Sequence, residues 1–177
     1  MAVAGIHLNY RGANMSAGAW LLIFAAIWQT AGALAATGLS PAHNCTAQLD
    51  AGLCGPACQT TICSLLVSLY NAQNGPVWFN QSGWQAAASA ASCQAYLAGA
   101  PGTPPAYCSW HGVSCCTAAS SSCAFPYAPS KLDLSVNNLN GSISSDAFLS
   151  SLAGLDSCGL RSLLIAAGNM TGVLDPR

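Results

Sequence analysis

The first clear pattern along the chain is an apolar run near its N-terminus. Residues 17–28 contain no polar side chain, and Arg11 is the only charged residue before them. Residues 33–35 read Ala-Leu-Ala, which has the small residues of a cleavage site. This order predicts a secretory signal peptide over residues 1–35, with the rest of the chain outside the cell. A signal anchor stays open as an alternative, because residues 17–36 are 20 uncharged residues.

A helical spacing of apolar residues follows between Ser64 and Asn74. Its apolar face is formed by Leu65, Leu66, Leu69 and Tyr70. Thr60 or Thr61 is expected to cap the helix, and Asn74-Gly75-Pro76 is expected to end it, with Gly75 in the left-handed conformation. Glycines and Pro56 predict an irregular lead over residues 36–63. The alanine-rich stretch 85–100 predicts one short helix.

A third pattern of apolar residues occurs twice in the C-terminal part of the chain. Apolar residues alternate from Leu132 to Leu134 and resume at Leu139 and Ile143, with Asn137 between them. A similar order starts 31 residues later, at Leu163 and Ile165. This is the pattern of leucine-rich repeats, and it predicts that these apolar residues fill a core. Asn137 is expected to point inward and to bond backbone groups of its own turn, and Gly141 to allow a tight bend.

The second copy departs from the pattern. Gly168 stands in the Asn position and Asn169 one place later. The 31-residue offset exceeds the usual 20–29 residues, so an insertion is expected within residues 150–162.

Composition narrows the class of protein. Charged residues make up 5% of the chain and hydrophobic residues 53%, against about 25% charged residues in an average globular protein. Four Lys and Arg residues do not supply the basic surface of a nucleic-acid-binding protein. The hydrophobic content excludes a disordered acidic chain.

Ten cysteines predict disulfides and an oxidising compartment. The paired CxxC spacing of zinc sites does not occur, so no metal or other cofactor is expected. Cys54 and Cys58 have three residues between them, one more than a thioredoxin-type redox motif has. Cys108 and Cys115 are spaced to close a tight loop over a tryptophan. Cys123 is a candidate partner for Cys116.

Four N-glycosylation sequons predict a glycoprotein. They start at Asn44, Asn80, Asn140 and Asn169. The aromatic residues Trp78, Phe79 and Trp84 are also close together. Such density is typical of a core, and a carbohydrate-stacking platform is the functional alternative.

Three motifs together resemble the plant-type leucine-rich-repeat N-terminal domain and its first repeats. They are LLVSLYNAQNGPVWFNQSGW at 65–84, CSWHGVSC at 108–115 and LDLSVNNLNGSIS at 132–144. The resemblance implies an α+β fold, in which a helical, disulfide-bonded cap over 64–128 precedes a short solenoid over 129–177. About two repeats and no C-terminal cap are expected. The chain is therefore expected to be a truncated product or a fragment of a longer protein. The resemblance also implies a Cys108–Cys115 disulfide and a cap core of Trp78, Trp84 and Trp110.

Proteins of this kind are extracellular recognition proteins, such as receptor-like proteins, receptor kinases and inhibitors of polygalacturonases. The resemblance therefore implies a non-enzymatic scaffold that binds a protein, a peptide or a cell-wall glycan, and neither nucleic acid nor, once the leader is cleaved, a membrane. His111 is expected to have a positional role. The expected ligand-facing residues are Asp133, Ser135, Val136, Leu164 and Ala166. A small secreted cysteine-rich wall-associated protein is the alternative.

Overall fold

The computed structural model describes residues 45–50, 52–99, 104–117, 123 and 125–165. The expected signal segment 1–35 lies outside these residues, as do Asn44, Ala166, Gly168 and Asn169.

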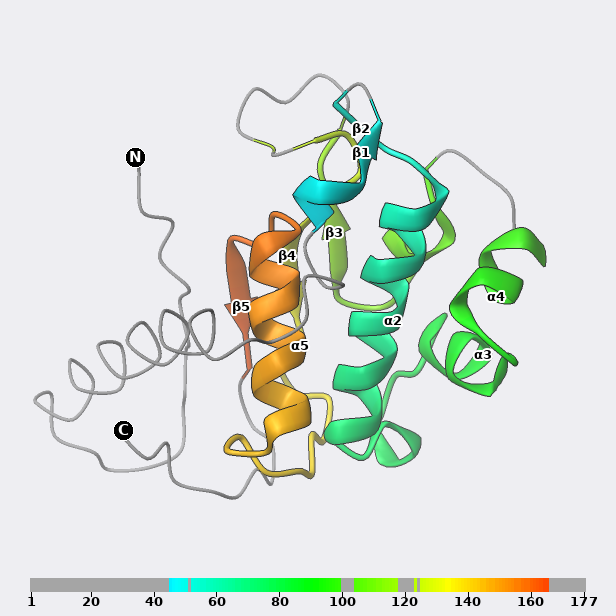
Figure 1. Ribbon diagram of the computed structural model, residues 1–177. Coiled ribbons are helices and arrows are strands. Elements are labelled where there is room, and N and C mark those ends of the chain that lie inside the picture. The colour runs from blue at the N-terminus through cyan, green and yellow to red at the C-terminus, as the bar shows by residue number, and fades with distance from the viewer. Residues whose placement is uncertain (1–44, 51, 100–103, 118–122, 124, 166–177) are drawn as a thin grey trace, which may run out of the picture.

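Helices pack on one side of a small sheet (Figure 1). In chain order, the elements are η2 (Cys45–Gln48), β1 (Leu49–Asp50), β2 (Leu53–Cys54), α2 (Pro56–Ala72), η3 (Gly75–Val77), α3 (Trp84–Ser89), α4 (Cys93–Gly99), η4 (Ala106–Ser109), β3 (Val113–Cys115), β4 (Pro129–Asp133), α5 (Asp146–Ser157) and β5 (Ser162–Leu164).

The central helix α2 starts eight residues before the predicted Ser64, at Pro56. Proline suits the first helical position, because its missing N–H would have no partner there. The prediction that Thr60 or Thr61 caps the helix is therefore wrong. Both hydroxyls lie inside α2 and donate to the carbonyl oxygens of Pro56 and Ala57, at 2.8 and 3.1 Å.

The end of α2 differs from the prediction by one residue. Asn74, not Gly75, adopts the left-handed conformation, with φ 52°. Gly75 is needed for another reason, because a Cβ there would collide with the ring of Tyr70. Downstream, the predicted alanine-rich helix is two helices, α3 and α4, and both pack against α2.

The sheet has the order β3-β4-β5. Strand β3 runs antiparallel to β4, while β5 runs parallel to β4 and pairs Leu132 with Leu163. The parallel pairing requires a crossover, and α5 supplies it. The expected insertion at 150–162 is therefore mainly the second part of this helix. Ser145 caps α5 by accepting a hydrogen bond from the N–H of Phe148 at 3.3 Å.

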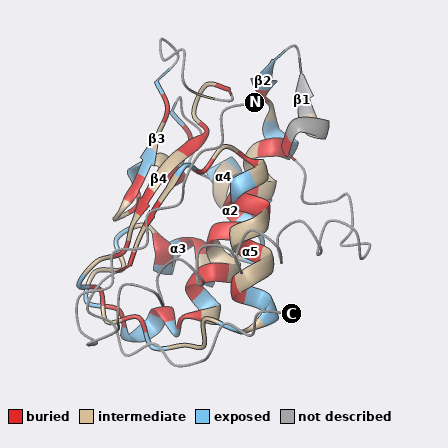
Figure 2. Cartoon of the chain, turned by 90° about the vertical axis from the view of Figure 1, so that its left-hand side faces the viewer, coloured by how far each residue is buried: buried red, intermediate tan, exposed pale blue. Residues whose placement is uncertain are grey.

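The core lies between the sheet and the helices, where the buried residues gather (Figure 2). Five of the predicted repeat-core leucines and isoleucines are at most 3% exposed: Leu132, Leu134, Leu139, Leu163 and Ile165. Ile143 is partly buried and packs against this cluster. Helix α5 lies alongside α2 (Figure 1), and Gly154 lets it approach the side chain of Leu65.

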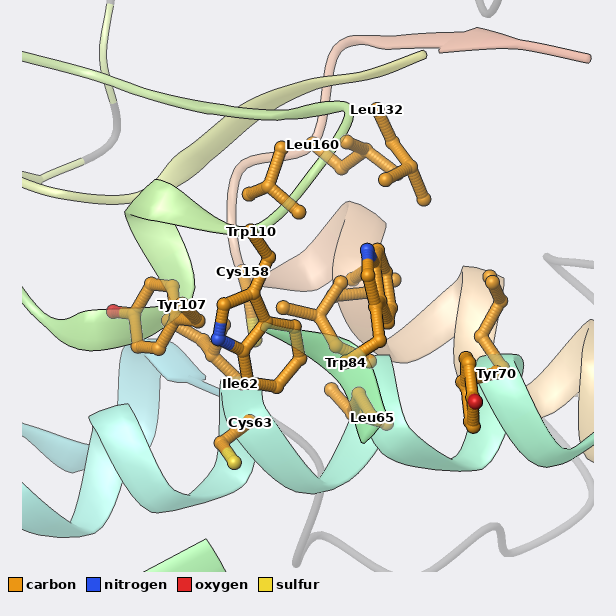
Figure 3. Close-up of a cluster of buried hydrophobic side chains, with 14 of the residues drawn as sticks. Ile62, Cys63, Leu65, Tyr70, Trp84, Tyr107, Trp110, Leu132, Cys158 and Leu160 are labelled. Carbon is orange, nitrogen blue, oxygen red and sulfur yellow. The ribbon is translucent and has the colours of Figure 1, made fainter. Parts of the chain in front are cut away.

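Aromatic rings fill the space between α2 and the sheet (Figure 3). The three predicted tryptophans, Trp78, Trp84 and Trp110, are buried, and neighbouring ring centroids lie 5.0 to 5.2 Å apart. Each indole N–H donates a hydrogen bond, at 2.9 to 3.1 Å. These bonds let the rings be buried without loss of their polar contacts.

All ten cysteines are paired, which is consistent with a secreted protein. The disulfides are Cys45–Cys158, Cys54–Cys58, Cys63–Cys93, Cys108–Cys115 and Cys116–Cys123. The first joins residues 113 positions apart and ties the lead to the end of α5. The structure is thus a mixture of helices and a small sheet with several disulfides.

Candidate functional site

The outer face of the sheet is the surface opposite the core. Along β4, Leu132 is buried whereas Lys131 and Asp133 are only half-buried, because side chains alternate between the two faces of a strand. The strand register places Ser114 and Ser162 beside Lys131, and Leu164 beside Asp133. We call the five residues Ser114, Lys131, Asp133, Ser162 and Leu164 the sheet face.

A single ion pair dominates the charge of the sheet face. Lys131 Nζ lies 3.1 Å from Asp133 Oδ2, and the two side chains are 43% and 37% exposed. Asp133 Oδ1 also accepts a hydrogen bond from the N–H of Ser135, at 3.2 Å. Burial alone would raise the pKa of Asp133, but the hydrogen bonds with Ser135 and Lys131 and the charge of Lys131 outweigh it and lower the pKa. Asp133 therefore stays ionised and fixed in place.

The sheet face ends at a loop in which two of the expected ligand-facing residues lie. Ser135 is half-buried, and Val136 is 65% exposed with φ 58°. A β-branched residue rarely adopts positive φ, because its Cβ crowds the backbone. The surrounding contacts must therefore hold this loop in place.

Asn137 supplies two of these contacts. It is 2% exposed and forms two hydrogen bonds with the backbone of Asn80. Its Oδ1 accepts from the Asn80 N–H at 2.7 Å, and its Nδ2 donates to the Asn80 carbonyl at 3.1 Å. Asn137 thus points inward as predicted, but its partners belong to a segment 57 residues earlier rather than to its own turn.

Gly141 lies in a bend, as predicted, and it has a second role. A Cβ at this position would collide with the carbonyl oxygen of Ala72 at the end of α2. The glycine therefore permits a close approach between the repeat segment and α2. Beside it, Gln73 is fully buried and donates to the carbonyl of Ser142 at 3.3 Å.

Next to the loop lies Phe79, which was expected to be part of the core but is exposed. Phe79 is 76% exposed, although its neighbours Trp78 and Trp84 are buried. Val77 and Val136 are exposed as well, at 41% and 65%. Asn138 donates from Nδ2 to the carbonyl of Val77 at 3.0 Å. This bond holds the segment that contains Val77 and Phe79 beside the loop that contains Val136.

Sequence reasoning missed three members of the sheet face, Ser114, Lys131 and Ser162. The alternation that identified Asp133 and Leu164 would have found Lys131 and Ser162, since each is the next outward position on the same strand. Ser114 could not be found in this way, because its place depends on the pairing of β3 with β4. His111 contributes through its backbone. Its N–H donates to Ser82 at 3.0 Å and its carbonyl accepts from the indole of Trp84 at 2.9 Å.

No group of three His, Cys, Asp or Glu side chains within the described ranges is arranged to hold a metal ion. Comparison with protein-family models, curated proteins and solved structures found no match to this chain. The helices that the structure describes are all too short or too polar to cross a membrane. The sheet face and the adjoining loop thus stand as the candidate site on geometry and sequence alone.

Proposed function

We propose that this chain is an extracellular recognition scaffold that binds a protein, a peptide or a cell-wall glycan on its sheet face. The observation that carries the proposal is the parallel pairing of Leu132 with Leu163 across one helix. Equivalent positions of the two sequence copies are thereby side by side. Their outward neighbours, Asp133 and Leu164, then form a continuous surface, which is how repeat proteins build binding faces.

The same pairing supports the resemblance found in the sequence. In this proposal, residues 64–128 are a leucine-rich-repeat cap and residues 129–177 are the first repeats. The chain would then be the N-terminal part of a receptor-like protein or of a receptor kinase ectodomain. A part of an inhibitor similar to those of polygalacturonases is a variant of this proposal.

The chemistry of the sheet face supports binding rather than catalysis. Asp133 is held by an ion pair and a hydrogen bond, and its lowered pKa keeps it from acting as a general acid near neutral pH. The remaining sheet-face members, beside Lys131, are two serines and a leucine. Such a surface offers hydrogen bonds and apolar contact to a ligand.

The five disulfides favour the second candidate, a small cysteine-rich structural protein of the cell wall. The two candidates differ in one respect. A recognition scaffold has a ligand that depends on the sheet face, whereas a structural protein has none.

The test uses the chain secreted from eukaryotic cells with its disulfides formed. The wild type is screened against immobilised cell-wall oligosaccharides and a displayed peptide library. Two variants then receive the same charge, Leu164→Lys on the sheet face and Gln94→Lys on the exposed surface of α4. We expect the selected ligand to bind Leu164→Lys at least about tenfold more weakly and Gln94→Lys unchanged. Equal binding by both variants, or no ligand at all, would reject the proposal.

A further inference from the structure

Asn80 is held in a way that leaves its side-chain nitrogen free. Both polar groups of its backbone are bonded to the side chain of Asn137. Its Oδ1 accepts a hydrogen bond from the N–H of Ser82 at 3.0 Å. Within the described part of the chain, Asn80 Nδ2 donates no hydrogen bond. The amide therefore has a fixed position and one unused nitrogen, the atom to which an N-linked sugar attaches.

Asn80 is one of the residues that line an open hollow of about 460 Å³. Phe79, Asn80, Ser82 and Gln85 are among the residues that line it. Phe79 is 76% exposed and contributes the aromatic side chain of this lining. Gln85 is exposed and adds an amide that has both hydrogen-bond donors and an acceptor. An aromatic face beside polar amides suits a neutral sugar ring, which has apolar C–H faces and hydroxyl edges.

We propose that this hollow holds the first sugar of an N-glycan on Asn80, with the sugar packed against Phe79. The transfer forms a bond between Asn80 Nδ2 and C1 of the sugar. It breaks the bond between C1 and the diphosphate of a lipid-linked oligosaccharide donor, and the diphosphate leaves as the amide gives up a proton. The glycan then covers the apolar ring and stabilises the loop that borders the sheet face. The inference rests on the extracellular location in the proposed function.

Asn140 is the other sequon asparagine in the described residues, and it differs in its surroundings. Its backbone N–H donates to the carbonyl of Gln73 at 3.3 Å, and its side chain is exposed. Gly141 follows it and Leu139, which is fully buried, precedes it. No exposed ring flanks Asn140, so a glycan there would extend into solvent. A glycan on Asn140 therefore serves as the matched control, because it has no aromatic ring to pack against.

The experiment compares melting temperatures of the protein secreted from a glycosylating eukaryotic host. Ser82→Ala removes the sequon but keeps the backbone N–H that holds Asn80, and Asn140→Gln removes the control sequon. Peptide mapping establishes occupancy of Asn80. We expect Ser82→Ala to melt about 2–4 °C below the wild type and Asn140→Gln to melt as the wild type does. Trimming to a single N-acetylglucosamine should preserve the wild-type value.

A double-mutant cycle locates the sugar. Phe79→Ser should lower the melting temperature of the glycosylated protein and leave that of Ser82→Ala unchanged. Equal effects in the two backgrounds would overturn the proposal, as would an unoccupied Asn80 in the wild type. So would an unchanged melting temperature in Ser82→Ala. If Asn80 were unoccupied and free chitobiose stabilised the protein, the hollow would bind an external sugar instead.

These outcomes are separate from those of the proposed function. The host and a heterologous signal peptide determine secretion here, so the melting temperatures do not depend on whether a ligand exists. Conversely, the charge introduced by Leu164→Lys lies on the sheet face and tests ligand binding with Asn80 unaltered.

Discussion

Removal of the Asn137 side-chain amide should destabilise the protein more than removal of the Asn138 amide. Asn137 and Asn138 are adjacent, and both bond to the same earlier segment. Asn137 is buried and forms two hydrogen bonds, whereas Asn138 is partly exposed and forms one. Asn137→Ala and Asn138→Ala therefore make a pair of adjacent substitutions that differ in burial, in the number of bonds lost and in backbone conformation.

The magnitude follows from the groups that lose their partners. A typical hydrogen bond contributes about 0.5–1.5 kcal/mol, and a buried group left without a partner costs about 1–3 kcal/mol. Asn80 is only half-buried, so water can reach part of its freed backbone. We expect Asn137→Ala to lower the free energy of unfolding by about 2–4 kcal/mol. Asn138→Ala loses one exposed bond and places alanine at φ 53°, for a cost of about 1–2 kcal/mol.

Asn137→Asp adds a dependence on pH. An ionised carboxylate accepts from the Asn80 N–H but faces the Asn80 carbonyl without a proton to donate. Only the protonated form replaces both bonds, so burial and the carbonyl raise the pKa of the new carboxyl group above its unfolded value of about 3.9. The sign follows from linkage. The penalty is smallest below the unfolded pKa and grows as pH rises through the folded one.

Urea denaturation with intact disulfides, followed by tryptophan fluorescence at pH 4 and pH 7, measures these differences. The wild type is measured at each pH as the reference. The reasoning would be refuted if the two alanine variants unfolded with the same free energy. A penalty for Asn137→Asp that did not change with pH would refute the assignment of the donated bond.

Three further predictions concern the core, the disulfides and the ion pair. Gly83→Ala should lower the melting temperature by at least about 4 °C, because Gly83 has φ 86° and a Cβ there would collide with the ring of Trp110. Gly99→Ala, which meets nothing within 4 Å, should not change it in the same calorimetric scan. Reduction of the five disulfides should lower the thermal midpoint and the far-UV helical signal, and an unchanged melt would show that the disulfides do not carry the stability. An NMR titration should find the pKa of the Asp133 carboxyl below its ordinary value, and Lys131→Met should raise it. Because the folded pKa is lowered, this group's stabilisation is present above the unfolded pKa and is lost as pH falls; an unshifted pKa would contradict the ion pair.

Local patterns predicted the parts of the fold whose causes are local. The alternation around Leu132 and Leu163 separated inward from outward residues, because a strand turns successive side chains to opposite faces. The helical spacing around Leu69 located the C-terminal half of α2. Its start was missed, because Pro56 was interpreted as a breaker although it also suits the first helical position.

The roles of the polar and exposed residues were harder to predict from the sequence than the positions of the core residues. Asn137 and Phe79 illustrate the reason. The burial of Asn137 followed from its place in the repeat, but its partner is 57 residues away and depends on how the loop meets α2 and η3. Phe79 follows a buried tryptophan and is itself exposed, in a bend of the chain that its local sequence did not predict.

The sequence by itself thus determined the composition, the alternation of core and surface residues at the strands, and the number of cysteines available to pair. The sequence had already suggested the pairs Cys108–Cys115 and Cys116–Cys123, and both form. Only the tertiary structure decided the pairing of cysteines that are distant in the chain, as when Cys45 reaches Cys158. It also decided that Ser114 and Leu164, from two other strands, join Asp133 on one face. Periodicity reports the environment of each residue along its own element, whereas pairings and surfaces arise from elements that are distant in the chain and adjacent in space.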